Sequence, residues 1–259
     1  MRWIRSAFVR GSWVPLALAL AAPAHASGSV NLAWSRCSGE GAGSQNAAFA
    51  CDTNAGQEVL VASFQLPADL AQVSGNEIVI DLLSQDDPMP AWWDFKNAGT
   101  CRQTSLSLNF AQDPGDVVCM NWQGGVASGG IGAYDMSGVP PDGNIDPSLA
   151  TRHRKLKIAL AVPPDALANL LAETEYFSCN IVINHAKTVG TGACGGCSGS
   201  VCLVLQDINV TTPVLANNIK MYGGTTPGSD WAHWQGSVAD CALVPVKNKT
   251  WGQVKALYR

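Results

Sequence analysis

One stretch of the sequence concentrates side chains that could bind or cut a sugar. Residues 84–102 read SQDDPMPAWWDFKNAGTCR, with acidic and aromatic residues in a segment broken by prolines. Tryptophan rings stack on the apolar faces of sugars, and carboxylates accept hydrogen bonds from hydroxyl groups. The predicted ligand-binding residues are therefore Trp92, Trp93, Asp94, Asp86 and Asp87. The structural alternative is that both tryptophans plug one end of an apolar core.

The same aspartates raise a catalytic alternative. Two carboxyl groups can act as general acid and general base on a glycosidic bond, which would make the protein a secreted glycoside-type hydrolase. The sequence contains no G-x-S-x-G elbow for a serine nucleophile. We therefore expect no catalytic residue, and hydrolysis by Asp86, Asp87 or Asp94 is the alternative.

Three histidines follow residue 26, and none lies in a recognisable catalytic motif. His153 belongs to the basic run RHRKLK, which we expect to form a solvated strand edge that discourages pairing with another chain. His185 closes the core-facing row of its strand and is expected to be a structural residue with its hydrogen bonds satisfied. His233 lies between Trp231 and Trp234 and is the only histidine in an aromatic setting.

The segment PDGNIDPS places oxygen-bearing side chains at every second position, as in the first half of a calcium loop. These candidate metal ligands are Asp142, Asn144 and Asp146. An EF-hand loop would continue with glycine at its sixth and glutamate at its twelfth position, where this chain has Pro147 and His153. The pattern indicates either a turn stiffened by structural Ca²⁺ or a plain Asx turn, and no other cofactor is expected.

All nine cysteines lie beyond residue 26, at positions 37, 51, 101, 119, 179, 194, 197, 202 and 241. In an exported chain they favour disulfides, and an odd number leaves at least one free or bonded to another chain. Strand alternation places Phe177, Cys179, Ile181 and Ile183 on one face. Cys179 is therefore predicted to be the buried free thiol.

Proximity in the sequence suggests how the other cysteines pair. It predicts bonds from Cys37 to Cys51 and from Cys101 to Cys119. The remaining four pair among themselves in one of three ways: Cys194, Cys197, Cys202 and Cys241. The segment GACGGCSGSVC also allows a thiol redox pair or a zinc site completed by His185, but export favours a disulfide-clamped loop.

The first 26 residues have the pattern of an export signal. Three arginines precede a short apolar run that ends in Ala24-His25-Ala26. Removing this segment leaves 13 basic and 20 acidic residues, a net charge of −7, which disfavours nucleic-acid binding. No later segment has the twenty or so apolar residues that a bilayer requires. We expect a secreted, extracellular or cell-surface protein with no transmembrane segment after cleavage.

The mature sequence is typical of an all-β fold. About ten short apolar segments are bounded by turn-forming residues: 30–34, 59–66, 77–83, 106–110, 116–120, 132–136, 156–162, 176–186, 201–210 and 217–222. They predict an antiparallel β-sandwich or jelly-roll-like domain over residues 27–246. Two short helical turns are expected over 67–72 and 164–171, whose similar surroundings suggest related halves of one sandwich.

The last thirteen residues, KNKTWGQVKALYR, differ from the rest of the chain because they are basic and aromatic. Thr250 and Gln253 form a capping box, so a short helix is predicted to begin near Trp251. Such a helix is too short to be stable alone in water. It would either dock on the domain or remain an accessible peptide for an export or anchoring machinery.

Several motifs of this chain are similar to those of a group of uncharacterised exported bacterial β-rich proteins. They are LAWSRC, WWDFKNAGTCR, ASGGIGAY, INHAKTVGTGAC and the terminal TWGQVKALYR, and they span most of the mature chain. The resemblance implies export, a shared β-rich fold and a portable C-terminal sorting or attachment signal, and it assigns no site. We therefore expect a non-catalytic protein that binds a glycan or another cell-surface component; a self-assembling surface or fibre subunit is a further alternative.

Overall fold

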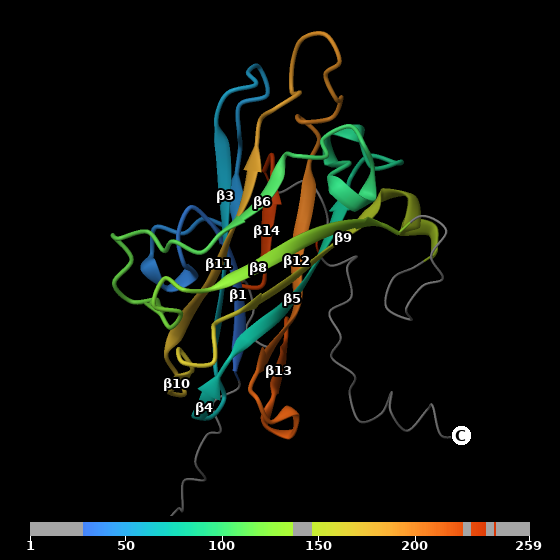
Figure 1. Ribbon diagram of the computed structural model, residues 1–259. Coiled ribbons are helices and arrows are strands. Elements are labelled where there is room, and N and C mark those ends of the chain that lie inside the picture. Colours follow the sequence, from blue (N-terminus) through green and yellow to red (C-terminus); the bar gives the residue numbers. More distant parts are fainter. Residues whose placement is uncertain (1–27, 137–146, 225–228, 237–240, 242–259) are drawn as a thin grey trace, which may run out of the picture.

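The computed structural model describes residues 28–136, 147–224, 229–236 and 241. The described chain is rich in β-strands, which form a five-stranded sheet, a seven-stranded sheet and a two-stranded ladder (Figure 1). Its helices are short 3-10 turns: η1 (Ser38–Glu40), η2 (Ala91–Trp93), η3 (Lys96–Ala98), η4 (Pro147–Arg152) and η5 (Leu215–Asn217). None of these described helices is long and apolar enough to cross a membrane.

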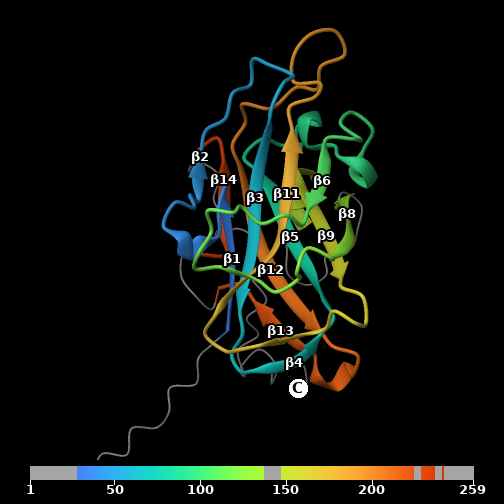
Figure 2. The same ribbon diagram turned by 60° about the vertical axis from the view of Figure 1, so that its left-hand side comes forward.

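The five-stranded sheet has the order β1-β3-β11-β6, and β7 pairs with one end of β11. Its strands are β1 (Ser29–Trp34), β3 (Gln57–Gln65), β6 (Leu106–Asn109), β7 (Met120–Asn121) and β11 (Glu175–Asn184). All pairs are antiparallel except the short parallel pair between β7 and β11. The long strands β3 and β11 lie side by side at the centre of this sheet, between β1 and β6 (Figure 2).

The seven-stranded sheet has the order β2-β14-β12-β5-β9-β8, with β13 also paired to β12. Its strands are β2 (Asn46–Ala47), β5 (Gly75–Ser84), β8 (Ser128–Asp135), β9 (His153–Ala161), β12 (Val201–Thr211), β13 (Ile219–Tyr222) and β14 (Trp231–Trp234). The pairs are antiparallel except for β2 with β14. The sheet is therefore mixed, and among the described strands β8 lies at one of its edges.

Both large sheets contribute to one hydrophobic core. Leu32 and Leu60 come from the five-stranded sheet, and Ile80, Leu156 and Leu203 come from the seven-stranded sheet. All five side chains have no exposed surface. Figure 2 shows the five-stranded sheet with strands of the other sheet behind it. In the second half of β9, the buried residues Leu156, Ile158 and Leu160 alternate with exposed residues, as expected for a strand with one face on the core.

The two predicted helical turns are wrong, because both segments pair as strands. β4 (Leu70–Val73) and β10 (Ala168–Leu170) form an antiparallel ladder at one end of the molecule (Figure 1). Gln72 has a φ of 57°, which a right-handed helix does not allow. Leu70, Val73 and Leu170 are buried in the main core. Helices this short gain little from their own hydrogen bonds, so burial and ladder pairing prevail.

A β-bulge in β11 shifts the predicted alternation by one residue. Phe177 pairs with Ser63 and Cys179 pairs with Ala62, which leaves Ser178 as the extra residue. Cys179 therefore faces the main core, while Phe177 packs in a separate cluster on the opposite face. The prediction that Phe177 shares the face of Cys179 is wrong. The prediction that Cys179 is buried and free is confirmed.

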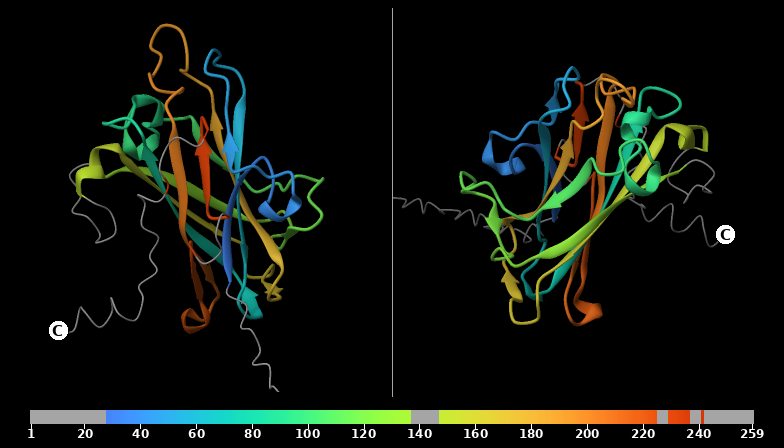
Figure 3. Two further views of the ribbon diagram at one scale, coloured as in Figure 1. Left: turned by 180° about the vertical axis from the view of Figure 1, so that it is seen from behind. Right: turned by 45° about the horizontal axis from the view of Figure 1, so that its top comes forward.

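Eight cysteines form four disulfides that join distant parts of the sequence: Cys37–Cys119, Cys51–Cys197, Cys101–Cys194 and Cys202–Cys241. Both neighbour pairings are wrong, since neither Cys37 with Cys51 nor Cys101 with Cys119 occurs. Of the last four cysteines only the final two bond each other. The segments 49–57, 85–103 and 185–200 meet at one end of the molecule (Figure 3), which explains the long-range bonds there. Cys194 and Cys197 of the CxxC segment bond different partners and therefore form no disulfide with each other in this structure.

Candidate ligand-binding groove

Both tryptophans of the predicted sugar-binding loop lie in the core. Trp92 and Trp93 in η2 have no exposed surface. Their rings pack against Trp234 of β14, at centroid distances of 4.7 and 5.5 Å. The indole N–H of Trp92 donates a hydrogen bond to Thr188 Oγ1 at 3.1 Å. Neither ring presents a face to a ligand in this structure. Both rings instead fill one end of the apolar core, as the structural alternative predicts.

A buried arginine holds the tryptophan loop to its neighbours. Arg102 is 1% exposed and donates to the backbone carbonyls of Trp92 at 3.0 Å, Ala186 at 3.2 Å and Asn184. Its guanidinium carbon lies 3.5 Å from the centroid of the Trp92 ring. Burial lowers the pKa of Arg102 to about 9, so the side chain is still protonated at neutral pH. These contacts assign it a structural role.

The three predicted carboxylates of this loop, Asp86, Asp87 and Asp94, have different surroundings. Asp87 is exposed and accepts a hydrogen bond from Thr151 Oγ1 at 2.6 Å. Asp94 accepts from Arg154 Nη2 at 3.0 Å, and Asp86 is exposed. No contact described for these residues joins the carboxylates to a common group. Hydrolysis by these carboxylates therefore stays a prediction.

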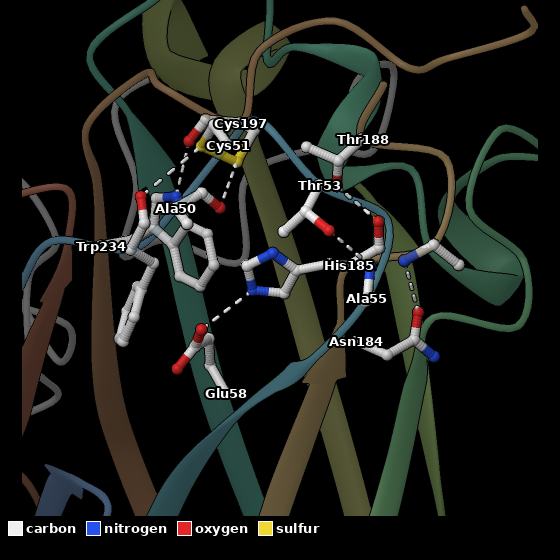
Figure 4. A network of polar contacts seen from close by, with 12 residues as sticks. Ala50, Cys51, Thr53, Ala55, Glu58, Asn184, His185, Thr188, Cys197 and Trp234 are labelled. Carbon is white, nitrogen blue, oxygen red and sulfur yellow. Dashed lines mark hydrogen bonds and ion pairs between the residues drawn. A yellow bond between two sulfur atoms is a disulfide. The ribbon is translucent and has the colours of Figure 1, made fainter. Parts of the chain in front are cut away.

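His185 belongs to a polar network beneath the loops that the disulfides join (Figure 4). Its Nε2 atom lies 2.9 Å from Glu58 Oε1, and the ring lies beside Trp234. The imidazole is 2% exposed, and its Nδ1 atom has no hydrogen-bond partner among the described residues. The indole N–H of Trp234 donates to the carbonyl of Cys197 at 2.6 Å. His185 is therefore buried as expected, but only one of its two ring nitrogens is hydrogen-bonded within the described structure.

The expected solvated edge at RHRKLK is wrong. These residues enter β9, which lies between β5 and β8 and is therefore an internal strand. His153 is 1% exposed, and its Nε2 atom lies 2.8 Å from Asp81 Oδ1. Lys155 is also buried and places its ammonium group 3.5 Å from the same oxygen. Buried charges need such partners because removing them from water is costly.

An open groove of about 580 Å³ runs over the face of β5, β9 and β8 that points away from the core. The register places Lys157 of β9 between Val79 of β5 and Gly132 of β8, and the next row on this face holds Glu77, Ala159 and Gly130. Small residues on β8 and β9 keep the floor of the groove low. A Cβ atom on Gly130 would meet no heavy atom within 4 Å, so the space above it is open.

Tyr134 supplies the aromatic surface of the groove. Its hydroxyl and ring lie over Gly132, where an added Cβ atom would come within 2.8 Å of the hydroxyl oxygen. The absence of a side chain at Gly132 therefore lets the ring lie against the sheet. Tyr134 is 40% exposed, which leaves ring surface available to a ligand. An aromatic ring supported in this way can stack on the apolar face of a sugar.

Polar groups surround this ring. Lys157 Nζ lies 5.6 Å from the centroid of Tyr134, and the amide nitrogen of Asn97 would lie 3.0 Å from a Cβ atom at Gly132. Glu77 is exposed at the other side of the groove and accepts a hydrogen bond from Asn209 at 3.1 Å. Ammonium and amide groups donate hydrogen bonds, whereas carboxylates accept them. The groove thus offers both kinds of partner to a hydroxylated ligand.

A second groove, of about 390 Å³, lies beside the five-stranded sheet and has an acidic lining. Asp113 and Asp116 line it, and each carboxylate is 3.3 Å from a guanidinium nitrogen of Arg36. Burial and the nearby charge of Glu40 raise the pKa of Asp116, whereas Arg36 opposes this shift. The lining contains no aromatic ring. The acidic groups already have a cation, so this groove is the weaker candidate.

The sequence pattern that points to sugar binding lies at the tryptophans and does not include the groove residues. One signal was present: in SGGIGAYD, strand alternation sets Gly130, Gly132 and Tyr134 on the face opposite Ile131 and Ala133. Lys157 and Glu77 join them only through strand pairing, which a local pattern does not reveal.

Three other predicted features fall outside the described residues. The export signal lies in residues 1–26, the possible calcium ligands, Asp142, Asn144 and Asp146, lie in 137–146, and the C-terminal helix lies in 242–259. All three stay predictions. Comparisons of the chain with models of known protein families, with curated proteins and with solved structures found no match.

Proposed function

We propose that the protein is an exported, non-catalytic β-sandwich that binds a carbohydrate in the groove over β5, β9 and β8. One observation carries this proposal: the Tyr134 ring lies over Gly132 in an open groove that also presents Lys157, Glu77 and Asn97. A stacking surface beside hydrogen-bond donors and acceptors suits the alternating apolar and hydroxylated faces of a sugar.

The proposal places the protein outside the cytoplasm, at the cell surface of a bacterium. The export-like N-terminus and the four disulfides support an oxidising compartment. In this proposal a surface glycan is the partner, and the basic C-terminal segment connects the protein to an export or anchoring machinery. The resemblance to exported bacterial β-rich proteins with a similar tail leads to the same proposal.

The alternative of self-assembly has one observation in its favour. β8 pairs only with β9 among the described strands, so its other edge forms no ladder with a described strand, and an unpaired edge is a place where a second copy could add a strand. β8 carries three glycines and no lysine or proline to discourage such pairing. The ninth thiol, by contrast, is buried and does not offer an intermolecular disulfide. Light scattering of the purified protein distinguishes a binding monomer from a concentration-dependent assembly.

Binding to a panel of immobilised glycans, followed by titration calorimetry, tests the carbohydrate proposal. Tyr134→Ala removes the stacking surface and should weaken binding about tenfold, since one such contact contributes ~1.4 kcal/mol. Gly130→Val should also weaken binding, because its side chain enters the open groove. Both variants should retain the melting temperature of the unmodified protein.

Tyr222→Ala is a matched control for the loss of a tyrosine. Tyr222 lies on the same face of the sheet, in β13, and has a lysine ammonium group 5.5 Å from its ring centroid, as Tyr134 has at 5.6 Å. It lies outside the groove lining. Unchanged binding in Tyr134→Ala, or an equal loss in Tyr222→Ala, would reject the groove as the binding site.

A further inference from the structure

A histidine adjoins one of the four disulfides on the outer face of the seven-stranded sheet. His233 Nε2 lies 3.1 Å from Cys241 Sγ, and Cys241 is bonded to Cys202. One ligand atom from each of the three residues lies within 4.8 Å of the other two. Cys202 has no exposed surface, His233 is 5% exposed and Cys241 is half-buried. Two sulfurs and one imidazole nitrogen thus converge at one point.

Strand pairing fixes two of these residues. Cys202 of β12 is the register partner of His233 of β14, so both side chains project from adjacent strands on one face. The other ring nitrogen of His233, Nδ1, lies 2.8 Å from Asn46 Oδ1 in β2. An amide oxygen only accepts hydrogen bonds, so Nδ1 donates to Asn46, and Nε2 is the ring nitrogen that faces the sulfurs. Leu83 and Val204 pack against Cys202 and limit the access of water.

We propose that this cluster is a redox-controlled zinc site, in which the Cys202–Cys241 disulfide and a bound Zn²⁺ are alternative states. A dithiol reductant supplies two electrons and two protons: the S–S bond breaks, two thiols form and the dithiol becomes a disulfide. Zn²⁺ then displaces the two thiol protons and binds both thiolates and His233 Nε2. The fourth tetrahedral position is left to water or to another ligand.

The geometry suits zinc. Zn–S bonds of about 2.3 Å and Zn–N bonds of about 2.0 Å place tetrahedral ligand atoms roughly 3.5 to 3.8 Å apart. The present separation of 3.1 Å between His233 Nε2 and Cys241 Sγ is close to this range. Rotation of the Cys241 side chain separates the two sulfurs once their bond is broken. Asn46 provides the hydrogen bond that orients zinc-bound histidines in many proteins.

The other disulfides lack an equally suitable third ligand among the described residues. Glu175 lies near Cys37 and Cys119, but its carboxylate already accepts hydrogen bonds from Ser63 Oγ at 2.5 Å and from the Gly39 N–H at 2.8 Å. The Cys51 sulfur faces the amide nitrogen of Gln235 at 3.1 Å, which donates a hydrogen bond and does not bind a metal. Among the described residues, an imidazole nitrogen lies within 4.8 Å of both sulfurs only at the Cys202–Cys241 bond.

Zinc protection of single cysteines tests the proposal. Mature protein, residues 27–259, is reduced with dithiothreitol, desalted under nitrogen and alkylated with iodoacetamide in the presence or absence of equimolar Zn²⁺. Mass spectrometry then measures alkylation at each cysteine. We expect zinc to slow alkylation of Cys202 and Cys241 about tenfold and to leave Cys101 and Cys194 unchanged, because thiolates bound to a metal react slowly.

Variants identify the contribution of the histidine. His233→Ala and His233→Gln should both abolish the zinc protection of Cys202 and Cys241. Both variants are made so that a folding defect in one of them does not prevent the test. Asn46→Ala should weaken zinc binding about tenfold in competition with a chromophoric chelator, and Asn46→Asp, which still accepts the Nδ1 hydrogen bond, should restore it. Equal zinc protection of Cys101, or protection that survives in a folded His233 variant, would overturn the proposal.

Discussion

The guanidinium group of Arg102 lies 3.5 Å from the centre of the Trp92 ring, in the interior of the protein. Ten residues separate the two in sequence, and the arginine also donates to the carbonyl oxygen of Trp92 at 3.0 Å. Arg102 therefore holds the predicted sugar-binding loop against the core. Its aromatic residues stabilise the end of the fold at which three disulfide-linked segments meet.

Arg102→Lys is expected to destabilise the protein strongly. Lysine has no planar fork, so it cannot reach all three carbonyl oxygens that Arg102 satisfies, those of Trp92, Asn184 and Ala186. Each buried acceptor left unpaired costs about 1–3 kcal/mol, and we expect a loss of about 3 kcal/mol in the free energy of unfolding. Chemical denaturation measures it. Arg152→Ala, at a partly exposed arginine with one long hydrogen bond to the Gln85 carbonyl, should change stability by less than about 0.5 kcal/mol.

The free thiol gives a second, independent check of the fold. Burial raises the pKa of Cys179 to about 12, and the side chain has no exposed surface. At pH 8 the thiol is therefore both protonated and shielded from reagents. Ellman's reagent should detect no thiol in the native protein and one per chain in guanidinium without reductant. A rapidly reacting thiol in the native protein, or none after unfolding, would contradict the assignment of four disulfides.

Asp230 predicts a specific pH dependence. Burial raises its pKa above the ordinary value of 3.8, although a hydrogen bond from the Gly224 N–H opposes the shift. Between about pH 3.8 and the folded pKa, Asp230 is therefore protonated in the folded state and ionised in the unfolded state. The free energy of unfolding falls as the pH rises through this range. Asp230→Asn removes the buried charge and still accepts the hydrogen bond.

The Asp230→Asn variant should accordingly melt at a higher temperature than the unmodified protein at pH 7. At pH values below 3.8 this advantage should vanish, because the carboxyl group is then neutral in both states. Calorimetric scans over this pH range provide the measurement. Asp165→Asn, at an exposed carboxylate, is the control and should show no comparable gain. A constant difference at every pH would show that the charge of Asp230 is not the cause.

The sequence predicts features that depend on local pattern better than features that depend on pairing. The strand-rich class and the buried Cys179 follow from short apolar segments and alternation, and both are confirmed. The bulge at Ser178 places Phe177 on the face opposite Cys179. Its position depends on pairing with β3 and cannot be read from the composition of the strand. Likewise, the ladder partner of Leu70 in β4 is Leu170 in β10, about a hundred residues later, which a local pattern does not reveal.

The candidate site shows the same division. Tyr134 and the glycines beside it share a face that alternation could have indicated, but Lys157 and Glu77 reach the groove through register across two strand pairs. The predicted disulfide pairing is wrong for the same reason, because Cys51 and Cys197 are far apart in the sequence and close in the fold. The prediction of a solvated edge at RHRKLK is wrong because the sequence does not show that Asp81 lies beside His153 and Lys155. This partner allows both charged side chains to be buried.

Deleting residues 247–259 is expected to change where the protein goes and to leave its stability unchanged. This segment carries three lysines and one arginine in thirteen residues, whereas the mature chain as a whole is acidic. A basic peptide with aromatic residues is suited to recognition by another molecule, and a helix of this length contributes little stability alone. Cell fractionation of the full and truncated proteins, with thermal unfolding of both, separates the roles. A truncated protein that reaches the same location but melts several degrees lower would show that the segment belongs to the domain.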